Sequence, residues 1–170
     1  MMKIIASMVM GVLALLVGCQ QANAENLGTI TLINNNGTKC NVSVVRGHHY
    51  YKLGDLGCGN DNVYNFELSG LPAGVLIKFC DEPDCKKASG PGIMNGWVYQ
   101  IQTLKRDSSV VYELDMFNGA LVGAVPNRAF KIVDVHENDG QQIHGKLSRV
   151  EVKYCTAEDT EPCPESPTKS

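Results

Sequence analysis

Several features that are common in enzymes and in nucleic-acid-binding proteins are missing from this sequence. Its Lys and Arg residues form no cluster or stripe and its formal net charge is -3, so binding to nucleic acid is not expected. No apolar period typical of an amphipathic helix follows the N-terminal segment, which argues against a helical fold. No Gly-x-Ser-x-Gly frame or comparable arrangement surrounds a serine. We therefore assign no catalytic residue and do not expect an enzyme.

Paired CxxC motifs are also missing, although the chain contains 7 cysteines. A zinc site needs such pairs or nearby histidines, so the cysteines are expected to form disulfides in an oxidising compartment. An odd number cannot all pair within one chain, and setting Cys19 aside as a lipid carrier leaves an even set. Sequence alone does not select the pairing, but pairing by proximity in the chain would join Cys40 with Cys58, Cys80 with Cys85, and Cys155 with Cys163.

The N-terminus has the form of an export signal. Its apolar run from Ile4 to Val17 follows Lys3 and is too short to span a bilayer comfortably, because a spanning helix needs about 20 apolar residues. Leu16-Val17-Gly18-Cys19 has the form of a bacterial lipobox, in which the cysteine is acylated and becomes the new N-terminus. Gln20 fits the pattern of lipoproteins sent to the outer membrane. We therefore predict an outer-membrane lipoprotein of the cell envelope, attached to the membrane through lipid at Cys19.

A second cleavage point competes with the lipobox. Ala22-Asn23-Ala24 has the small-x-small form of ordinary signal cleavage, which would leave a secreted or periplasmic protein beginning at Glu25. With lipid attachment, the chain divides into a signal peptide, a polar tether, one all-β domain and a disordered acidic, proline-bearing tail. The predicted bounds are 1–18, 19–27, 28–155 and 156–170.

Short β-prone runs alternate with Gly, Pro and Asn turns along the predicted domain. The runs Val63–Leu68 and Val75–Cys80 alternate apolar and polar residues, which is typical of a sheet with one buried face and one solvated face. Other strands are expected at 29–33, 40–45, 97–104, 110–116, 130–135 and 147–154, and the apolar segment 118–126 is expected to be a buried edge or a close-packed loop. The prediction is an all-β, disulfide-braced fold, an antiparallel Greek-key sandwich or barrel of about eight to nine strands.

Two acidic stretches carry oxygen atoms of the kind that calcium prefers. Asn60 and Asp61 precede the first of these alternating strands, and Asp81, Glu82 and Asp84 follow the second. Calcium needs six to eight oxygen ligands from carboxylates, amides and loop carbonyls. Calcium is therefore the one cofactor that the sequence suggests, and a solvated acidic surface is the alternative.

The run 59–68, followed by 71–81, resembles half of a βγ-crystallin-type Greek key. That family has an Asn/Asp pair, two variable residues, then Ser/Thr and Ser, a strand, a Pro/Gly turn and an aromatic-bearing strand. The resemblance implies a Greek-key sandwich, with calcium bound by paired Asn/Asp loops as in many microbial members, and Asn60 and Asp61 match the first two motif positions. Tyr64 and Asn65 stand where the family has hydroxyl residues, one of them a calcium ligand, and no clean second copy of the motif is found.

The four histidines do not form a metal-binding pattern. His48 and His49 are adjacent, and neighbouring strand residues point to opposite faces. His136 and His144 flank a polar loop. The predicted function is a non-catalytic envelope lipoprotein that acts as a binding module for a protein or an envelope polymer. The alternatives are a βγ-crystallin-like calcium-binding module and, with least support, an envelope hydrolase.

Overall fold

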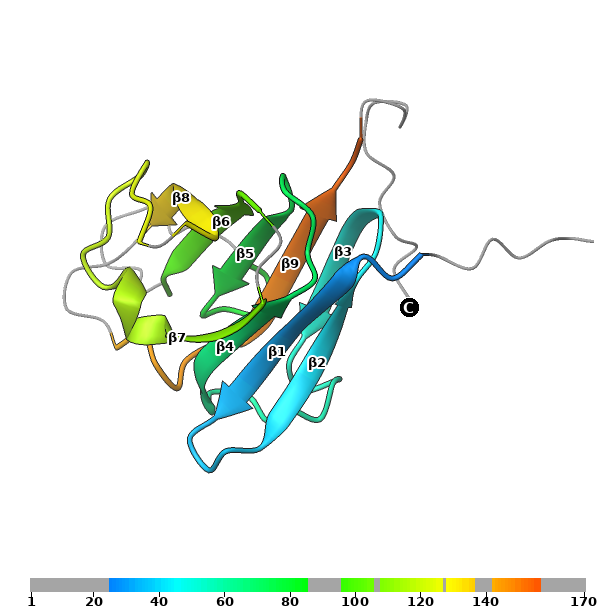
Figure 1. Ribbon diagram of the computed structural model, residues 1–170. Coiled ribbons are helices and arrows are strands. Elements are labelled where there is room, and N and C mark those ends of the chain that lie inside the picture. Colours follow the sequence, from blue (N-terminus) through cyan, green and yellow to red (C-terminus); the bar gives the residue numbers. More distant parts are fainter. Residues whose placement is uncertain (1–24, 86–95, 106–107, 127, 137–141, 157–170) are drawn as a thin grey trace, which may run out of the picture.

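The computed structural model describes residues 25–85, 96–105, 108–126, 128–136 and 142–156. These residues form two antiparallel sheets that pack face to face as an open sandwich, not a closed barrel (Figure 1). The predicted all-β, disulfide-braced sandwich is confirmed. The predicted signal peptide, Cys19, Cys163 and the acidic tail beyond Thr156 lie outside the described residues.

The first sheet has four strands in the order β2-β1-β4-β7, and the second has five in the order β3-β9-β5-β6-β8. Their bounds are β1 Gly28–Asn34, β2 Lys39–Val44, β3 Gly47–Lys52, β4 Val63–Ser69, β5 Leu76–Cys80, β6 Val98–Thr103, β7 Ser108–Glu113, β8 Phe130–His136 and β9 Arg149–Tyr154. The fourth strand returns to pair with β1, as in a Greek key. In the same way, β9 returns to pair with β5.

Each sheet is completed by a strand from the other half of the chain. The third strand leaves β1 and β2 and pairs with β9 in the second sheet. In return, β7 leaves β5 and β6 and pairs with β4 in the first sheet. The molecule therefore consists of two similar units, β1–β4 and β5–β9, that exchange their third strands, with β8 as an additional strand at the edge of the second sheet.

The core lies between the sheets and is rich in aromatic rings. Phe66 of β4 lies at its centre, with ring centroids 4.9 Å from Phe79, 5.2 Å from Tyr112 and 5.9 Å from Phe117. Trp97 is fully buried beside this cluster. Burying a large apolar side chain contributes about 1.5–3 kcal/mol, so these contacts join the two sheets firmly. The rigid core fixes the loops at the ends of the strands.

Two of the predictions for residues 110–126 are wrong. The strand predicted to run to Met116 ends at Glu113 and is followed by a 3-10 turn, η1, Leu114–Phe117. This turn buries Leu114 and Phe117, because residues three apart lie on one face of a 3-10 helix. The following segment is neither a buried edge nor a close-packed loop, since Leu121, Val122 and Val125 are exposed.

Candidate functional site

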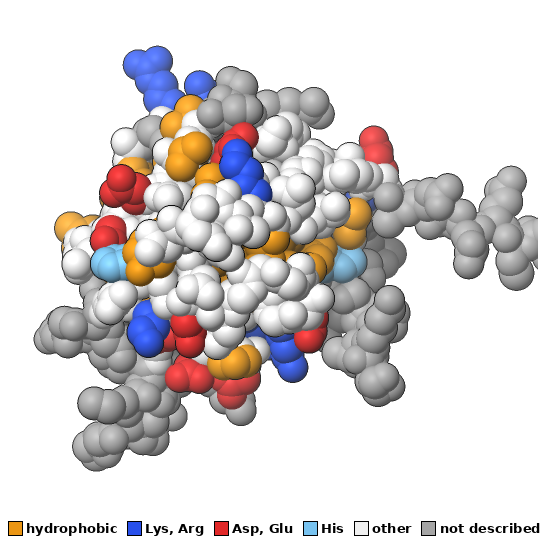
Figure 2. All heavy atoms as spheres, turned by 90° about the horizontal axis from the view of Figure 1, so that it is seen from below, with side chains coloured by type: hydrophobic (Ala, Val, Ile, Leu, Met, Phe, Trp, Pro, Cys, Tyr) orange, Lys and Arg blue, Asp and Glu red, His pale blue; other side chains and the backbone are white. Residues whose placement is uncertain are grey.

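A cavity of about 400 Å³ opens at the end of the sandwich that carries the loop before β4. Three separate stretches of chain form its walls: the loop before β4, the turn after β5 and the segment leading into β9. Its lining residues are Asn60, Asp61, Asp81, Glu82, Pro83, Gln142, Lys146 and Ser148. We call it the acidic pocket. Figure 2 views the molecule from below, where acidic and basic side chains lie near one another among polar groups.

The loop before β4 is fixed by one disulfide and by hydrogen bonds to both halves. Cys58 is bonded to Cys40 of β2, and the side-chain amide of Asn34 donates to the Cys58 carbonyl at 2.7 Å. The Asp61 N–H donates to the Leu147 carbonyl at 3.4 Å. Asp61 itself has φ of 57°, a left-handed conformation that non-glycine residues rarely adopt. Such a residue persists only where its surroundings hold it, and it often marks a functional site.

The opposite wall carries Asp81, which is packed against a glycine. A Cβ atom at Gly96 would lie 2.3 Å from the Cβ atom of Asp81, so only glycine leaves room for this carboxylate. The Asp81 N–H donates to the Trp97 carbonyl at 3.1 Å. The adjoining turn is closed by the Cys80–Cys85 disulfide and is held from β9 by Arg149, whose Nη1 donates to the Pro83 carbonyl at 2.9 Å.

The negative charge of Asp81 is disfavoured by burial and by the other acidic side chains of this pocket. Burial raises the pKa of Asp81 from 3.8 to about 6, and repulsion from Glu82 and Asp61 adds to the shift. Lys146, which lines the same cavity, acts in the opposite direction on this pKa. At neutral pH the carboxylate is still ionised, so the free protein keeps a cluster of negative charge that a bound cationic group would stabilise.

The predicted calcium residues meet here only in part. Asn60, Asp61, Asp81 and Glu82 come together in one pocket, whereas Asp84 is not among its lining residues. Within the described part of the chain, no three His, Cys, Asp or Glu side chains are grouped closely enough to hold a metal ion. Lys146 also places an ammonium group in the same cavity. The pocket is therefore not a complete calcium cage, and calcium would depend on backbone carbonyls and water for most of its ligands.

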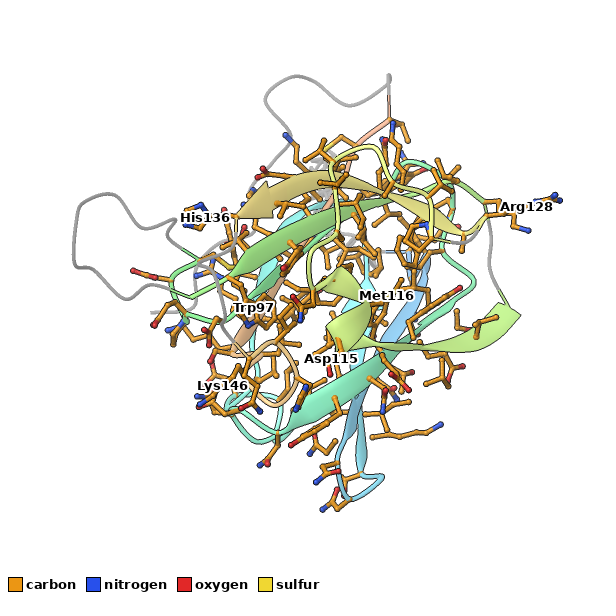
Figure 3. The ribbon with its side chains drawn as sticks, turned by 90° about the vertical axis from the view of Figure 1, so that its left-hand side faces the viewer. Trp97, Asp115, Met116, Arg128, His136 and Lys146 are labelled. Carbon is orange, nitrogen blue, oxygen red and sulfur yellow. A yellow bond between two sulfur atoms is a disulfide. The ribbon has the colours of Figure 1, made fainter. Side chains whose placement is uncertain are left out.

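A second cavity, of about 330 Å³, lies beside the β1–β2 turn. Its lining residues are Asn35, Tyr64, Asn65, Glu113, Asp115 and His144, and we call it the histidine pocket. Nδ1 of His144 lies 2.6 Å from a carboxylate oxygen of Asp115 in η1. The Tyr64 ring packs on the imidazole, with centroids 4.9 Å apart. Figure 3 shows Asp115 on η1, on the side of the molecule that carries β7 and β8.

The two pockets occupy equivalent places in the two halves of the chain. The Asp61 N–H donates to the carbonyl of Leu147, while the Gly145 N–H donates to the carbonyl of Val63 at 2.8 Å. Asp61 lies two positions before Val63, and Gly145 lies two positions before Leu147, so the two hydrogen bonds are related by exchange of the halves. Both donor residues have a left-handed backbone, with φ of 57° and 68°. An aspartate thus stands in one half where a glycine stands in the other.

This equivalence identifies candidate site residues that the sequence did not. Lys146 and Ser148 line the acidic pocket from the second half, and the Ser148 hydroxyl donates to Asp61 Oδ1 at 3.3 Å. The feature that points to Lys146 and Ser148 is a left-handed residue in the loop shortly before a strand. This feature occurs twice, at Asp61 before β4 and at Gly145 before β9. It escaped notice because only the first loop carries an Asn/Asp pair.

The cysteine predictions agree with the structure where it describes both partners. Cys40 pairs with Cys58 and Cys80 pairs with Cys85. Cys155 is also disulfide-bonded. Cys163, its predicted partner, lies outside the described residues, so that pairing stays a prediction.

Comparisons with protein families, with characterised protein sequences and with solved structures found no match to this chain. In the described residues, no helix has the length and hydrophobicity needed to cross a membrane. The function must therefore be argued from the pockets and surfaces themselves.

Proposed function

We propose that this protein is a non-catalytic binding module of the bacterial cell envelope, attached to the membrane by lipid at Cys19. In this proposal, the acidic pocket binds a cationic group of its partner, such as a Lys or Arg side chain of a protein or an amine of an envelope polymer. The domain presents the pocket on loops, and the sandwich fixes the positions of those loops.

One observation carries the proposal: the negative charge of Asp81 is maintained against burial and against its neighbours. Its raised pKa means that ionisation costs free energy in the free protein. A ligand ammonium or guanidinium beside Asp81, Glu82 and Asp61 would offset that cost, because an opposite charge favours the ionised carboxylate. A carboxyl group with a perturbed pKa in a cavity is typical of binding sites.

The bracing of the pocket supports the same function. The Cys40–Cys58 and Cys80–Cys85 disulfides stand directly beside its two acidic walls. Repelling side chains on free loops would move apart, whereas crosslinked loops keep them together. A preorganised site loses less conformational entropy when the ligand binds.

The test compares two carboxylates in equivalent pockets. Purified protein carrying wild-type sequence, Asp81→Asn or Asp115→Asn is used to capture partners from an envelope extract of the source cells, with captured molecules identified by mass spectrometry. We expect Asp81→Asn to lose a partner that wild type and Asp115→Asn both retain. Recovery of nothing above background, or equal capture by all three proteins, contradicts the proposal.

The lipid attachment has its own test. Intact-mass measurement of the membrane-extracted protein should show acyl chains on an N-terminal Cys19, and Cys19→Ala should release the protein from the membrane. A mass that begins at Glu25 without lipid would instead support the secreted or periplasmic alternative.

Calcium binding is the second candidate, and the contact between Asp61 and Ser148 favours it. This hydrogen bond, at 3.3 Å, joins a carboxylate of one half to a hydroxyl of the other, and both oxygens are suitable calcium ligands. The sequence resemblance of 59–81 to a βγ-crystallin-type Greek key, which implies calcium binding, points to the same candidate. Calorimetric titration decides: no heat and no shift in melting temperature in millimolar calcium rejects this candidate.

A further inference from the structure

The histidine pocket gathers polar side chains that have no partner in the protein. Four of its lining side chains form no hydrogen bond or ion pair in the described part of the chain, namely those of Asn35, Tyr64, Asn65 and Glu113. They come from three separate stretches: the β1–β2 turn, β4 and the end of β7. Polar groups that converge on one cavity are typical of a ligand site. The acidic pocket is a separate cavity, so a ligand here would be additional to the function proposed above.

His144 is held in one orientation by Asp115 of η1, the turn that faces the viewer in Figure 3. Its Nδ1 lies 2.6 Å from both carboxylate oxygens, and its backbone N–H donates to Oδ1 of the same aspartate at 3.3 Å. Because a carboxylate only accepts hydrogen bonds, Nδ1 carries a proton, and Nε2 of the neutral ring is an acceptor. Nε2 forms no hydrogen bond with the described residues. The imidazole can therefore accept a hydrogen bond from a ligand without losing its contact with Asp115.

Tyr64 is fixed by the same loop. Its ring packs on the imidazole of His144, with centroids 4.9 Å apart. A Cβ atom at Gly145 would lie 3.1 Å from Cε2 of Tyr64, so the ring also packs closely on the backbone of that glycine. The Gly145 N–H donates to the carbonyl of Val63, directly before Tyr64, at 2.8 Å. A side chain that is already fixed loses little conformational entropy when a ligand binds.

Asn65 and Glu113 lie opposite each other on neighbouring strands. They are register partners in the antiparallel pair of β4 and β7, so their side chains lie close together on one face of the sheet. An Asn amide offers two donor hydrogens and an acceptor oxygen, whereas a carboxylate offers acceptors alone. With the Tyr64 hydroxyl and Nε2 of His144, the cavity presents donors and acceptors side by side.

This set of groups fits a neutral ligand that is rich in hydroxyl groups. Asp115 is already engaged by His144, and Glu113 is the one other charged side chain among the described lining residues. Glu113 repels an anion, and a single exposed carboxylate contributes little to binding a cation. An apolar ligand would leave the amides and the carboxylate unpaired, which costs free energy. A hydroxyl group both donates and accepts, so neighbouring hydroxyls can satisfy the mixed set.

We propose that the histidine pocket binds a saccharide through the hydroxyl groups of one sugar unit. One hydroxyl donates to Nε2 of His144, and neighbouring hydroxyls share the Asn65 amide and the Glu113 carboxylate. Tyr64 contributes its own hydroxyl and an aromatic surface. The cavity of about 330 Å³ lies within the range of small-molecule sites, which runs from about 300 to 1,000 Å³.

The test is a nuclear magnetic resonance titration of the whole chain, held in a detergent that has no sugar head group. The probes are glucose, galactose, mannose and N-acetylglucosamine, each added separately. We expect at least one of them to shift the backbone amide signals of Asn65, Glu113 and His144 in a saturable manner. The expected dissociation constant is about 1 mM, because a few hydrogen bonds in an open pocket give weak binding.

Two variants measure the contribution of the free polar groups. Asn65→Ala should raise the dissociation constant about tenfold, and Tyr64→Phe, which removes one hydroxyl, about threefold. Both variants should fold, because both side chains are only partly buried. Asn41→Ala, at an exposed position of β2 outside the pocket, is the matched control and should bind the sugar like wild type.

Glycerol and methylammonium serve as negative probes. The proposal is overturned if none of the four sugars binds, if Asn65→Ala leaves sugar binding unchanged, or if the shifts are confined to the acidic pocket. It is also overturned if glycerol binds as tightly as the best sugar, since that would show no recognition of a sugar ring. Binding of methylammonium at Asn65 and Glu113 in place of the sugars would assign the pocket to cations and overturn it as well.

Discussion

The acidic pocket and the histidine pocket stand at equivalent places in the two halves, but they are stabilised by different means. The acidic pocket gathers Asp61, Asp81 and Glu82 between two loops, each held by a disulfide. In the histidine pocket, the Asp115 carboxylate contacts the His144 imidazole instead of other carboxylates. The difference teaches that one backbone arrangement can hold either a mutually repelling cluster or a complementary pair. The turn that carries Asp81 and Glu82 of the repelling cluster is closed by its own disulfide, Cys80–Cys85.

Removing the disulfides tests that comparison most severely. Replacing both cysteines of the Cys40–Cys58 pair by alanine should lower the free energy of unfolding by about 3 kcal/mol, because this bond closes the longer loop, and replacing the Cys80–Cys85 pair should lower it by about 2 kcal/mol. Denaturant titration of each double variant measures the loss. An unchanged midpoint for both would show that the pocket does not need its covalent bracing.

Replacing one glycine in each half by alanine should give the next largest loss of unfolding free energy. Gly96 precedes Trp97, which accepts from the Asp81 N–H, just as Gly37 precedes Thr38, which accepts from the Asn34 N–H at 2.9 Å. Gly96→Ala should cost about 2 kcal/mol, because its Cβ atom would overlap the base of Asp81. Gly37→Ala meets no neighbouring atom and should cost about 1 kcal/mol, from its φ of 81° alone. Thermal unfolding measures both, and a larger loss at position 37 would contradict the crowding at Asp81.

The raised pKa of Asp81 predicts a smaller effect of pH. Its carboxyl is protonated in the folded and unfolded states below its ordinary value of 3.8, and the unfolded chain ionises first as pH rises toward about 6. The contribution of Asp81 to stability therefore falls across this range and stays low at neutral pH. Acidification from neutral pH to about 4 should recover about 1 kcal/mol, after allowance for screening by solvent.

The control for this effect is Asp81→Asn, which should remove that part of the pH dependence. The measured quantity is the difference in unfolding free energy between wild type and Asp81→Asn at each pH. A difference that is constant with pH, or that grows in favour of wild type as pH rises, would contradict the electrostatic account of the pocket.

The smallest effect is expected in the histidine pocket. Asp115→Asn and His144→Gln should each lower the free energy of unfolding by less than about 1 kcal/mol, because the pair is partly exposed and surface ion pairs contribute little. Capture of the partner proposed for the acidic pocket should be unchanged in both variants. A loss of several kcal/mol, or loss of the partner, would remove the distinction between the pockets.

The features that follow local rules could be predicted from the sequence. Alternation predicted that Ile77 and Phe79 of β5 and Phe66 and Leu68 of β4 share a face, and these side chains enter the core, because strand periodicity is set within the strand. At the start of β4 the alternation fails, since Val63 is buried and Tyr64 is only partly buried. Proximity in the chain also paired Cys40 with Cys58 and Cys80 with Cys85 correctly. Asn60 and Asp61 were grouped with Asp81 because each flanks a recognisable strand.

The features that depend on contacts between distant segments could not be predicted. Lys146 and Ser148 reach the acidic pocket only because β9 returns beside β5 and the loop before β9 meets the loop before β4. Neither of these contacts between distant segments produces a repeating pattern of apolar and polar residues that could be recognised in the sequence. The apolar composition around Leu121 likewise does not reveal exposure, since the same residues would suit a buried loop. The strand β3, with its polar His48 and His49, is recognisable only from its pairing with β9.

The exchange of β3 and β7 also governs how the molecule can come apart. Each sheet contains one strand from the other half of the chain, so neither β1–β4 nor β5–β9 contains all the strands of its sheet. A fragment that comprises only one half should therefore be an unstructured polypeptide. A protease that cuts the link between β4 and β5 would release nothing, because the severed pieces stay interlocked. Such interlocking would preserve the shape even after the chain has been nicked.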